Sequence, residues 1–184
     1  MGLFLFITDR GLFLENRVLH VLGGLLINVV RSTSYVILLV LLLPVTQQLI
    51  GTTIGPLAAS VSLSVAAVAF YARLVQGSLC EVDPGVIQAA TAFGASPAQI
   101  ISNVLLVESL PGLIRGLTIT AISLIGYSAM AGIVGGGGVG DLAIRFGYYR
   151  YQTDVMLMTV AVLIVLVQLV QMGGDKIARS ADKK

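Results

Sequence analysis

The chain has 184 residues, of which 57% are hydrophobic and only 11% are charged, and its net charge is +2. Soluble domains carry about 25% charged residues, so this composition excludes an ordinary soluble enzyme and a disordered chain. The small net charge gives no indication of a nucleic-acid partner, and a single cysteine excludes an internal disulfide.

Long unbroken apolar runs predict an all-α integral membrane protein, a polytopic helical bundle that forms one transmembrane domain over residues 1–184. A β-barrel would instead show short segments of alternating polarity. A helix that crosses a bilayer needs about 20 mostly apolar residues. The segments that meet this requirement are residues 32–50, 54–75, 113–134 and 155–172.

The first 31 residues fit this scheme less simply. Residues 1–8 are apolar but too short to span, residues 9–17 are polar, and residues 18–30 are apolar again. If residues 18–50 formed one straight helix, it would be about 50 Å long, much longer than a bilayer core. We therefore expect a break or a tilt near Arg31.

The basic residues predict how the chain is oriented, because they concentrate on the cytoplasmic side. With the loop over residues 76–112 in the cytoplasm, nine of the 11 basic residues lie inside and only Arg145 and Arg150 lie outside. The C-terminus is then cytoplasmic, and residues 135–154 form an outer loop.

The loop over residues 76–112 contains signals for two capped helices. Asp83 followed by Pro84 is typical of a helix start, and Gly94 of a helix end in the left-handed conformation. Ser96 and Pro97 repeat the start signal, and Pro111 is expected to close the second helix. An interfacial helix lying on lipid is the simpler alternative, but such helices are usually rich in lysine and arginine, and residues 84–107 contain neither.

The helix expected over residues 113–134 is more polar than a structural span needs to be. Thr120, Ser123 and Tyr127 share one face, Met130 lies on the same face, and Ser128 adds another hydroxyl. A polar face within a span must turn toward protein or water, which predicts a substrate pathway along these residues. The alternative is that the hydroxyl groups donate to carbonyls one turn earlier.

The cytoplasmic loop resembles that of permease subunits of bacterial ABC importers. The family pattern is Glu-Ala-Ala, three residues, Gly, nine residues and Ile-x-Leu-Pro. Here Gln88-Ala89-Ala90 precedes Gly94 at this spacing, and the stretch 104–107 follows after nine residues. Gln88 replaces the acid and Val107 replaces the proline. Residues 127–132, 135–140 and 148–151 are similar to those of methionine-importer permeases in particular.

The resemblance implies a type I importer fold in the bacterial plasma (inner) membrane, in a copy that lacks most of the first transmembrane helix. It implies a separate cytoplasmic ABC ATPase, a second copy of the chain, an extracytoplasmic solute-binding protein that delivers solute near residues 135–151, and a lipid surround. The residues implied to couple to the ATPase are Ile87, Gln88, Ala89, Ala90, Phe93 and Gly94. The substrate it implies is methionine.

Several other motifs are weighed and set aside. Gly135-x-Gly137-x-x-Gly140 matches a dinucleotide fingerprint as a string, but it follows a membrane span instead of a strand, so a flexible glycine turn is expected. The chain has no Gly-Lys-Ser/Thr motif for ATP. Cys80 and His20 lack the companions of a metal or catalytic site, so we expect no metal, no cofactor and no catalytic residue.

Three alternatives to a methionine permease stay open. The first is a permease for another amino acid or small polar solute. The second is an ion-coupled secondary carrier, although such carriers usually show internal repeats and acidic residues at mid-membrane, and neither is visible here. The third is an intramembrane enzyme, which needs paired ionisable residues inside the spans, where only Arg31 is a candidate.

Overall fold

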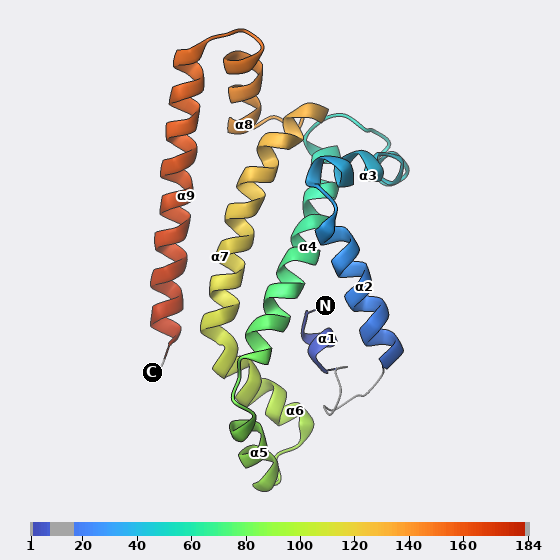
Figure 1. Ribbon diagram of the computed structural model, residues 1–184, viewed down its shortest axis with the longest axis vertical. Coiled ribbons are helices and arrows are strands. Elements are labelled where there is room, and N and C mark those ends of the chain that lie inside the picture. Colours follow the sequence, from blue (N-terminus) through green and yellow to red (C-terminus); the bar gives the residue numbers. More distant parts are fainter. Residues whose placement is uncertain (1, 8–16, 183–184) are drawn as a thin grey trace.

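The computed structural model describes residues 2–7 and 17–182 (Figure 1). Within these ranges every regular element is helical, which confirms the all-α prediction. The elements in chain order are α1 (Gly2–Ile7), α2 (Arg17–Ser32), α3 (Tyr35–Ile50), α4 (Pro56–Cys80), α5 (Pro84–Ala92), α6 (Pro97–Gln99), η1 (Ile100–Leu105), α7 (Leu106–Ala131), η2 (Gly132–Val134), α8 (Val139–Leu142), η3 (Ala143–Tyr148) and α9 (Thr153–Ala181). Of these, η1 and η3 are π-helical.

Three long helices form the body of the molecule, with α7 packed between α4 and α9 (Figure 1). Helices α1, α2 and α3 pack against α4. Helix α5 lies at one end of the bundle, which we call the α5 end. Helix α3 and the turn that follows η3 lie at the other end, which we call the α8 end.

Small side chains allow α4 to pack closely on its neighbours. Ala58, Ser62 and Ala66 recur every four residues and are all buried, with exposed fractions of 5%, 2% and 8%. Such a small-residue stripe is how helices approach without a large apolar driving force between them in lipid. The stripe holds the bundle core together, where it meets Tyr35, Leu38 and Ala131.

The break expected near Arg31 is present between α2 and α3. The described part of α2, His20–Ser32, and α3 meet at an angle of 113°. The Thr33 hydroxyl donates to the Val29 carbonyl at 2.8 Å, and Ser34 is extended (φ −56°, ψ 139°), which ends the helical path. The segment expected as one span over residues 32–50 therefore starts inside this bend, and α3 alone is about 24 Å long.

Three helical stretches in the described chain are long and apolar enough to cross a membrane: Pro56–Cys80, Pro97–Ala131 and Thr153–Ala181. They contain most of the segments expected over residues 54–75, 113–134 and 155–172. The bent α2–α3 pair is a fourth if it counts as one broken span.

The prediction that Pro111 closes the second helix of the loop is wrong. Helical geometry runs without interruption from Pro97 to Ala131, with Pro111 inside α7. Proline removes one backbone hydrogen bond and widens the local turn, and membrane helices tolerate this where neighbouring groups pack around the site. Here the adjacent Gly112 lies against the Ser78 side chain of α4, where an added Cβ would stand 2.8 Å from Ser78 Oγ.

The segment expected as an outer loop over residues 135–154 is largely helical. The glycine-rich turn is confined to residues 135–138, and α8 and η3 follow it at once. Both short helices pack against α9, and α8 also contacts α7. The expected glycine turn is thus present at residues 135–138, and the rest of this segment is mostly helix that packs on α9.

A pair of adjacent glycines in α9 tests how tightly α7 and α9 pack. A Cβ on Gly174 would overlap the Thr118 side chain, whereas a Cβ on Gly173 would meet nothing within 4 Å. We expect Gly174→Ala to lower the stability of the protein in detergent by about 1–3 kcal/mol through overpacking. We expect Gly173→Ala to be neutral or to raise stability by up to about 1 kcal/mol. Thermal unfolding of the two purified variants measures the difference, and equal midpoints would contradict this packing.

Candidate functional site

The helix α5 is held at its start by the cap that the sequence predicts. The backbone N–H of Gly85 donates to Asp83 Oδ1 at 2.7 Å, and Pro84 occupies the first helical position. These contacts satisfy one free N–H group and place the proline where its missing N–H costs nothing. The helix is therefore defined by its own sequence instead of by burial, since none of its residues is buried.

Gly94 ends this helix in the left-handed conformation, with φ of +81°. Its N–H donates to the Thr91 carbonyl at 2.9 Å, and the N–H of Ala95 donates to the Ala90 carbonyl at 3.1 Å. This is the glycine C-cap predicted from the sequence. No atom lies within 4 Å of where a Cβ would stand, so the conformation and not the space requires glycine here.

The candidate coupling residues divide between two faces of α5. Ile87 packs on a cluster formed by Leu79, Val82 and Leu105, which attaches the helix to the bundle. Phe93 points the other way and is 92% exposed. Gln88, Ala89 and Gly94 are exposed as well, and Ala90 is half-buried. The exposed side is thus a small-residue surface that ends in one large aromatic ring.

The second cap of the loop is also present. The backbone N–H and the hydroxyl of Ser96 both donate to Gln99 Oε1, at 2.9 and 3.0 Å. This joins the start of α6 to its first turn, in the manner of a capping box. Because the helix then continues through η1 into α7, the turn at Gly94 is connected to the bundle by one unbroken element.

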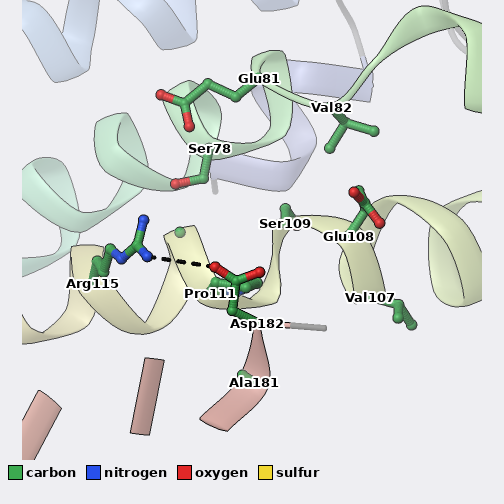
Figure 2. Close-up of a pocket in the computed structure, with 11 residues that line it drawn as sticks. Ser78, Glu81, Val82, Val107, Glu108, Ser109, Pro111, Arg115, Ala181 and Asp182 are labelled. Carbon is green, nitrogen blue, oxygen red and sulfur yellow. Dashed lines mark ion pairs between the residues drawn. The ribbon is translucent and has the colours of Figure 1, made fainter. Parts of the chain in front are cut away.

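A cavity of about 350 Å³ lies beside this element, where α4, α7 and the C-terminal end of α9 meet (Figure 2). Arg115 on α7 forms an ion pair with Asp182 at 3.8 Å. Glu81 and Glu108 also line the cavity. Both members of the pair are more than one-third exposed, so its contribution to stability is small.

The serine and threonine hydroxyl groups among the candidate pathway residues bond within α7. Thr120 donates to the Gly116 carbonyl at 2.8 Å and Ser123 to the Ile119 carbonyl at 2.9 Å. Ser128 donates to the Ile125 carbonyl at 2.7 Å. This is the alternative that the sequence left open for these groups, and it satisfies each hydroxyl without a ligand.

The candidate pathway residues do not share one environment. Thr120 is buried inside the chain (4% exposed), and Met130 is 42% exposed. Tyr127 is half-buried and stacks on Tyr35, with ring centroids 4.9 Å apart and planes 8° from parallel. The structure therefore brings Tyr127 together with the start of α3, a neighbour that spacing within one helix does not reveal.

Tyr35 is the functional candidate that the sequence analysis missed. It is 5% exposed, and its hydroxyl lies 3.1 Å from Ser62 Oγ. Ser62 donates its own proton to the Ala59 carbonyl at 3.0 Å, so Tyr35 is the donor to Ser62. A small cavity of about 30 Å³ adjoins the stacked rings and is also lined by Arg31 and Phe70. The sequence did contain one signal for Tyr35, because it is an aromatic residue that follows the helix break predicted near Arg31.

The α8 end carries a second charged pair and several exposed aromatic rings. Arg145 donates to the carboxylate of Asp141 at 2.9–3.0 Å, and Asp141 is buried. Tyr148, Tyr149 and Tyr151 are exposed, and the Arg150 guanidinium lies 4.7 Å from the centroid of the Phe146 ring. In the described residues no group of three or more histidine, cysteine, aspartate or glutamate side chains is placed to hold a metal ion.

Known proteins resemble this chain over its full length. It is 46% identical over 184 residues to a probable D-methionine transport system permease protein MetI of Vibrio cholerae, covering 100% of this chain and 82% of that protein. It is 42% identical over 180 residues to a methionine import system permease protein MetP of Bacillus subtilis, covering 98% and 81% of the two chains.

A solved structure extends the likeness to the fold. A chain from inward-facing conformations of the MetNI methionine ABC transporter superposes with a TM-score of 0.95 at 43% identity, covering 99% of this chain and 84% of that one. This agreement confirms the type I permease fold implied by the sequence resemblance and supports a multi-pass protein of the inner membrane.

The family model described as "binding-protein-dependent transport system inner membrane component" matches residues 6–180. That match takes in every helix described above from α2 to η3, and all of α9 except its last residue. With both the fold and the sequence in agreement, the chain belongs to the family of binding-protein-dependent transport system inner membrane components.

Proposed function

We propose that this chain is the permease subunit of an ATP-driven importer of methionine, that two copies form the solute pathway, and that a separate cytoplasmic ABC ATPase subunit hydrolyses the ATP. The observation that carries the proposal is full-length similarity to methionine permeases at 42–46% identity. The absence of a Gly-Lys-Ser/Thr motif in the sequence agrees with ATP hydrolysis on another subunit.

The surface of α5 is the proposed contact with the ATPase. Its exposed side combines Gln88 and Ala89 with the ring of Phe93, and a groove on a partner binds a short helix through such an anchor. Ile87 belongs to the same helix but packs on the bundle, and Ala90 is half-buried beside the exposed side. Gly94 sets the angle at which the exposed side meets the partner.

The orientation follows from this assignment. With α5 in the cytoplasm, the C-terminus is cytoplasmic too, because Arg115 and Asp182 join the end of α9 to the same end of the bundle. The α8 end then faces outward, and an extracytoplasmic solute-binding protein would dock near residues 135–151. The exposed tyrosines at that end supply rigid contact area for such a partner.

Within the two-copy assembly, the proposed pathway runs along α7 beside Ser123, Tyr127 and Met130. Thr120 and Ser128 then act as supports, because both bond back to their own helix. An exposed methionine beside a stacked tyrosine pair offers a soft apolar surface for a thioether solute.

Reconstitution tests the proposed function directly. The chain is co-expressed with its ATPase, placed in proteoliposomes and supplied with the solute-binding protein, and uptake of radiolabelled methionine is measured with and without ATP. ATP-dependent uptake supports the proposal. Uptake of another amino acid but not of methionine would change the substrate, and uptake driven by an ion gradient without ATP would favour a secondary carrier.

The proposed pathway predicts a difference in labelling between two sites of similar exposure. In a Cys80→Ser background, Met130→Cys is expected to react with a water-soluble thiol reagent, at a rate that ATP changes at least about threefold. Val160→Cys is the control, because Val160 is 40% exposed and Met130 is 42% exposed. Val160 lies on the apolar helix α9, where lipid excludes the reagent. Equal labelling of both sites would contradict the pathway.

A further inference from the structure

Arg31, which the count of basic residues placed on the cytoplasmic side, lies beside the middle part of α4 in the structure and not at one of its ends. It is the only lysine, arginine, aspartate or glutamate between residues 18 and 72. Its guanidinium lies 6.0 Å from the centroid of the Phe70 ring. Phe70 comes 14 residues after Pro56 and ten before Cys80 in α4, which is about 21 Å from one end of that helix and about 15 Å from the other.

The helix that carries Arg31 has two unlike faces. Leu22, Leu25, Leu26 and Val29 are each 57–61% exposed and form an apolar face suited to lipid. Gly24, Asn28 and Arg31 follow one another at helical spacing along the other side. A polar strip with a charge at mid-depth must turn toward protein or a water-filled path, because lipid does not solvate it.

The surroundings of Arg31 neutralise its charge only in part. Its position in the last turn of α2 is favourable, because the free carbonyl groups there carry partial negative charge. The Phe70 ring adds a weak attraction at 6.0 Å. Among the described residues, however, no carboxylate forms an ion pair with Arg31.

The cavity of about 30 Å³ beside Arg31 is also lined by Tyr127, one of the proposed pathway residues. Arg31, Phe70, Tyr35 and Tyr127 line the same space. Tyr127 belongs to the face of α7 that also carries Ser123 and Met130. An exposed guanidinium therefore stands beside an aromatic surface, and no carboxylate of the described residues pairs with its five N–H donors.

We propose that Arg31 binds the α-carboxylate of the transported amino acid partway across the membrane, with the apolar side chain of the solute against Tyr127. The inference rests on the proposed function and assigns one residue of that pathway. A guanidinium matches a carboxylate with two parallel hydrogen bonds, which gives both charge and orientation. Because the carboxylate stays ionised in a low-dielectric space only when it is paired, Arg31 also lowers the barrier to its passage.

The test measures binding to the permease–ATPase complex in detergent without the solute-binding protein, so that recognition by that protein does not enter. Radiolabelled methionine is the ligand, and methioninol, which keeps the amine and the thioether but lacks the carboxylate, is the competitor. The variants are Arg31→Met and Arg31→Lys. Arg73→Met is the matched control, since Arg73 lies near the α5 end and donates to Gln76 of its own helix at 2.9 Å.

The wild type is expected to prefer methionine to methioninol by about tenfold to a hundredfold, the range of a charge-assisted contact. Arg31→Met is expected to remove this preference, and Arg31→Lys to keep part of it. Arg73→Met is expected to bind like the wild type. A preference that persists in Arg31→Met would overturn the inference.

Two further results decide the remaining cases. If Arg31→Met does not assemble with the ATPase, the inference is tested with the wild type and Arg31→Lys alone. Equal binding of methionine and methioninol by the wild type then overturns it. Methionine uptake by wild-type proteoliposomes, measured in parallel, separates the two proposals. Normal uptake with no carboxylate preference refutes the role of Arg31 alone, whereas no methionine uptake by the wild type refutes the proposed function.

Discussion

A Gly94→Val protein is expected to assemble in the membrane at normal abundance and to lose at least about nine-tenths of its ATP-driven uptake. Gly94 has φ of +81°, and a β-branched residue in that conformation costs about 1–2 kcal/mol. The strain is relieved when the turn opens, which changes the direction in which Phe93 and the end of α5 are presented. The core does not change, because no residue of α5 is buried.

Gly94→Asn is the matched variant for this experiment. Asparagine is about as large as valine but tolerates the left-handed conformation far better. Retained uptake in Gly94→Asn together with loss in Gly94→Val would assign the effect to backbone conformation instead of bulk at the contact. Normal uptake by Gly94→Val at normal abundance would show that the turn has no part in coupling.

The largest loss of stability is expected for Tyr35→Ala. The ring of Tyr35 is 5% exposed, stacks on Tyr127 and packs in the cluster around Leu38 and Ala66. Removal of a buried aromatic side chain costs about 3–5 kcal/mol, because the cavity does not fully collapse. Because folded proteins are only marginally stable, a loss of this much free energy of unfolding is expected to lower the unfolding temperature clearly.

Two companion variants separate the ring from its hydroxyl. Tyr35→Phe keeps the stack and loses only the bond to Ser62, which already donates to Ala59, so we expect a loss of about 1 kcal/mol. Tyr148→Ala removes a tyrosine that is 68% exposed and is expected to change little. Thermal unfolding in detergent ranks the three, and a Tyr35→Ala protein as stable as Tyr148→Ala would refute the packing role.

Local signals in the sequence predicted local structure well. The caps at Asp83 and Ser96 and the left-handed Gly94 depend on a few adjacent residues, and all are present in the structure. The break near Arg31, which was predicted from the length of the apolar run, is present as well. The prediction that Pro111 ends a helix was wrong, because the effect of a proline on a helix depends on residues that are distant in the sequence. Proline often ends a helix, but this helix continues through Pro111, and the adjacent Gly112 packs closely on Ser78 of α4.

The candidate site was harder to predict, because helix periodicity shows which residues share a face but not what that face meets. Thr120 and Tyr127 do lie on one side of α7, yet Thr120 is buried and Tyr127 stacks on a residue 92 positions earlier. The partner of that stack is fixed by the 113° bend between α2 and α3. The size of such a bend depends on tertiary packing, so spacing along one helix does not reveal it.

The unbroken helix from Pro97 to Ala131 has a mechanical consequence. It is 35 residues and about 52 Å long, and Gly116 is a point of close approach to α4, where an added Cβ would lie 3.2 Å from Leu74 Cβ. If the rod pivots there, its arms are about 28 Å toward Pro97 and about 22 Å toward Ala131. A sideways shift of about 4 Å at the Pro97 end then moves the Ala131 end by about 3 Å in the opposite direction. Such a lever has a ratio of about 0.8, so a displacement imposed at one membrane surface reaches the other reversed and smaller by about a fifth.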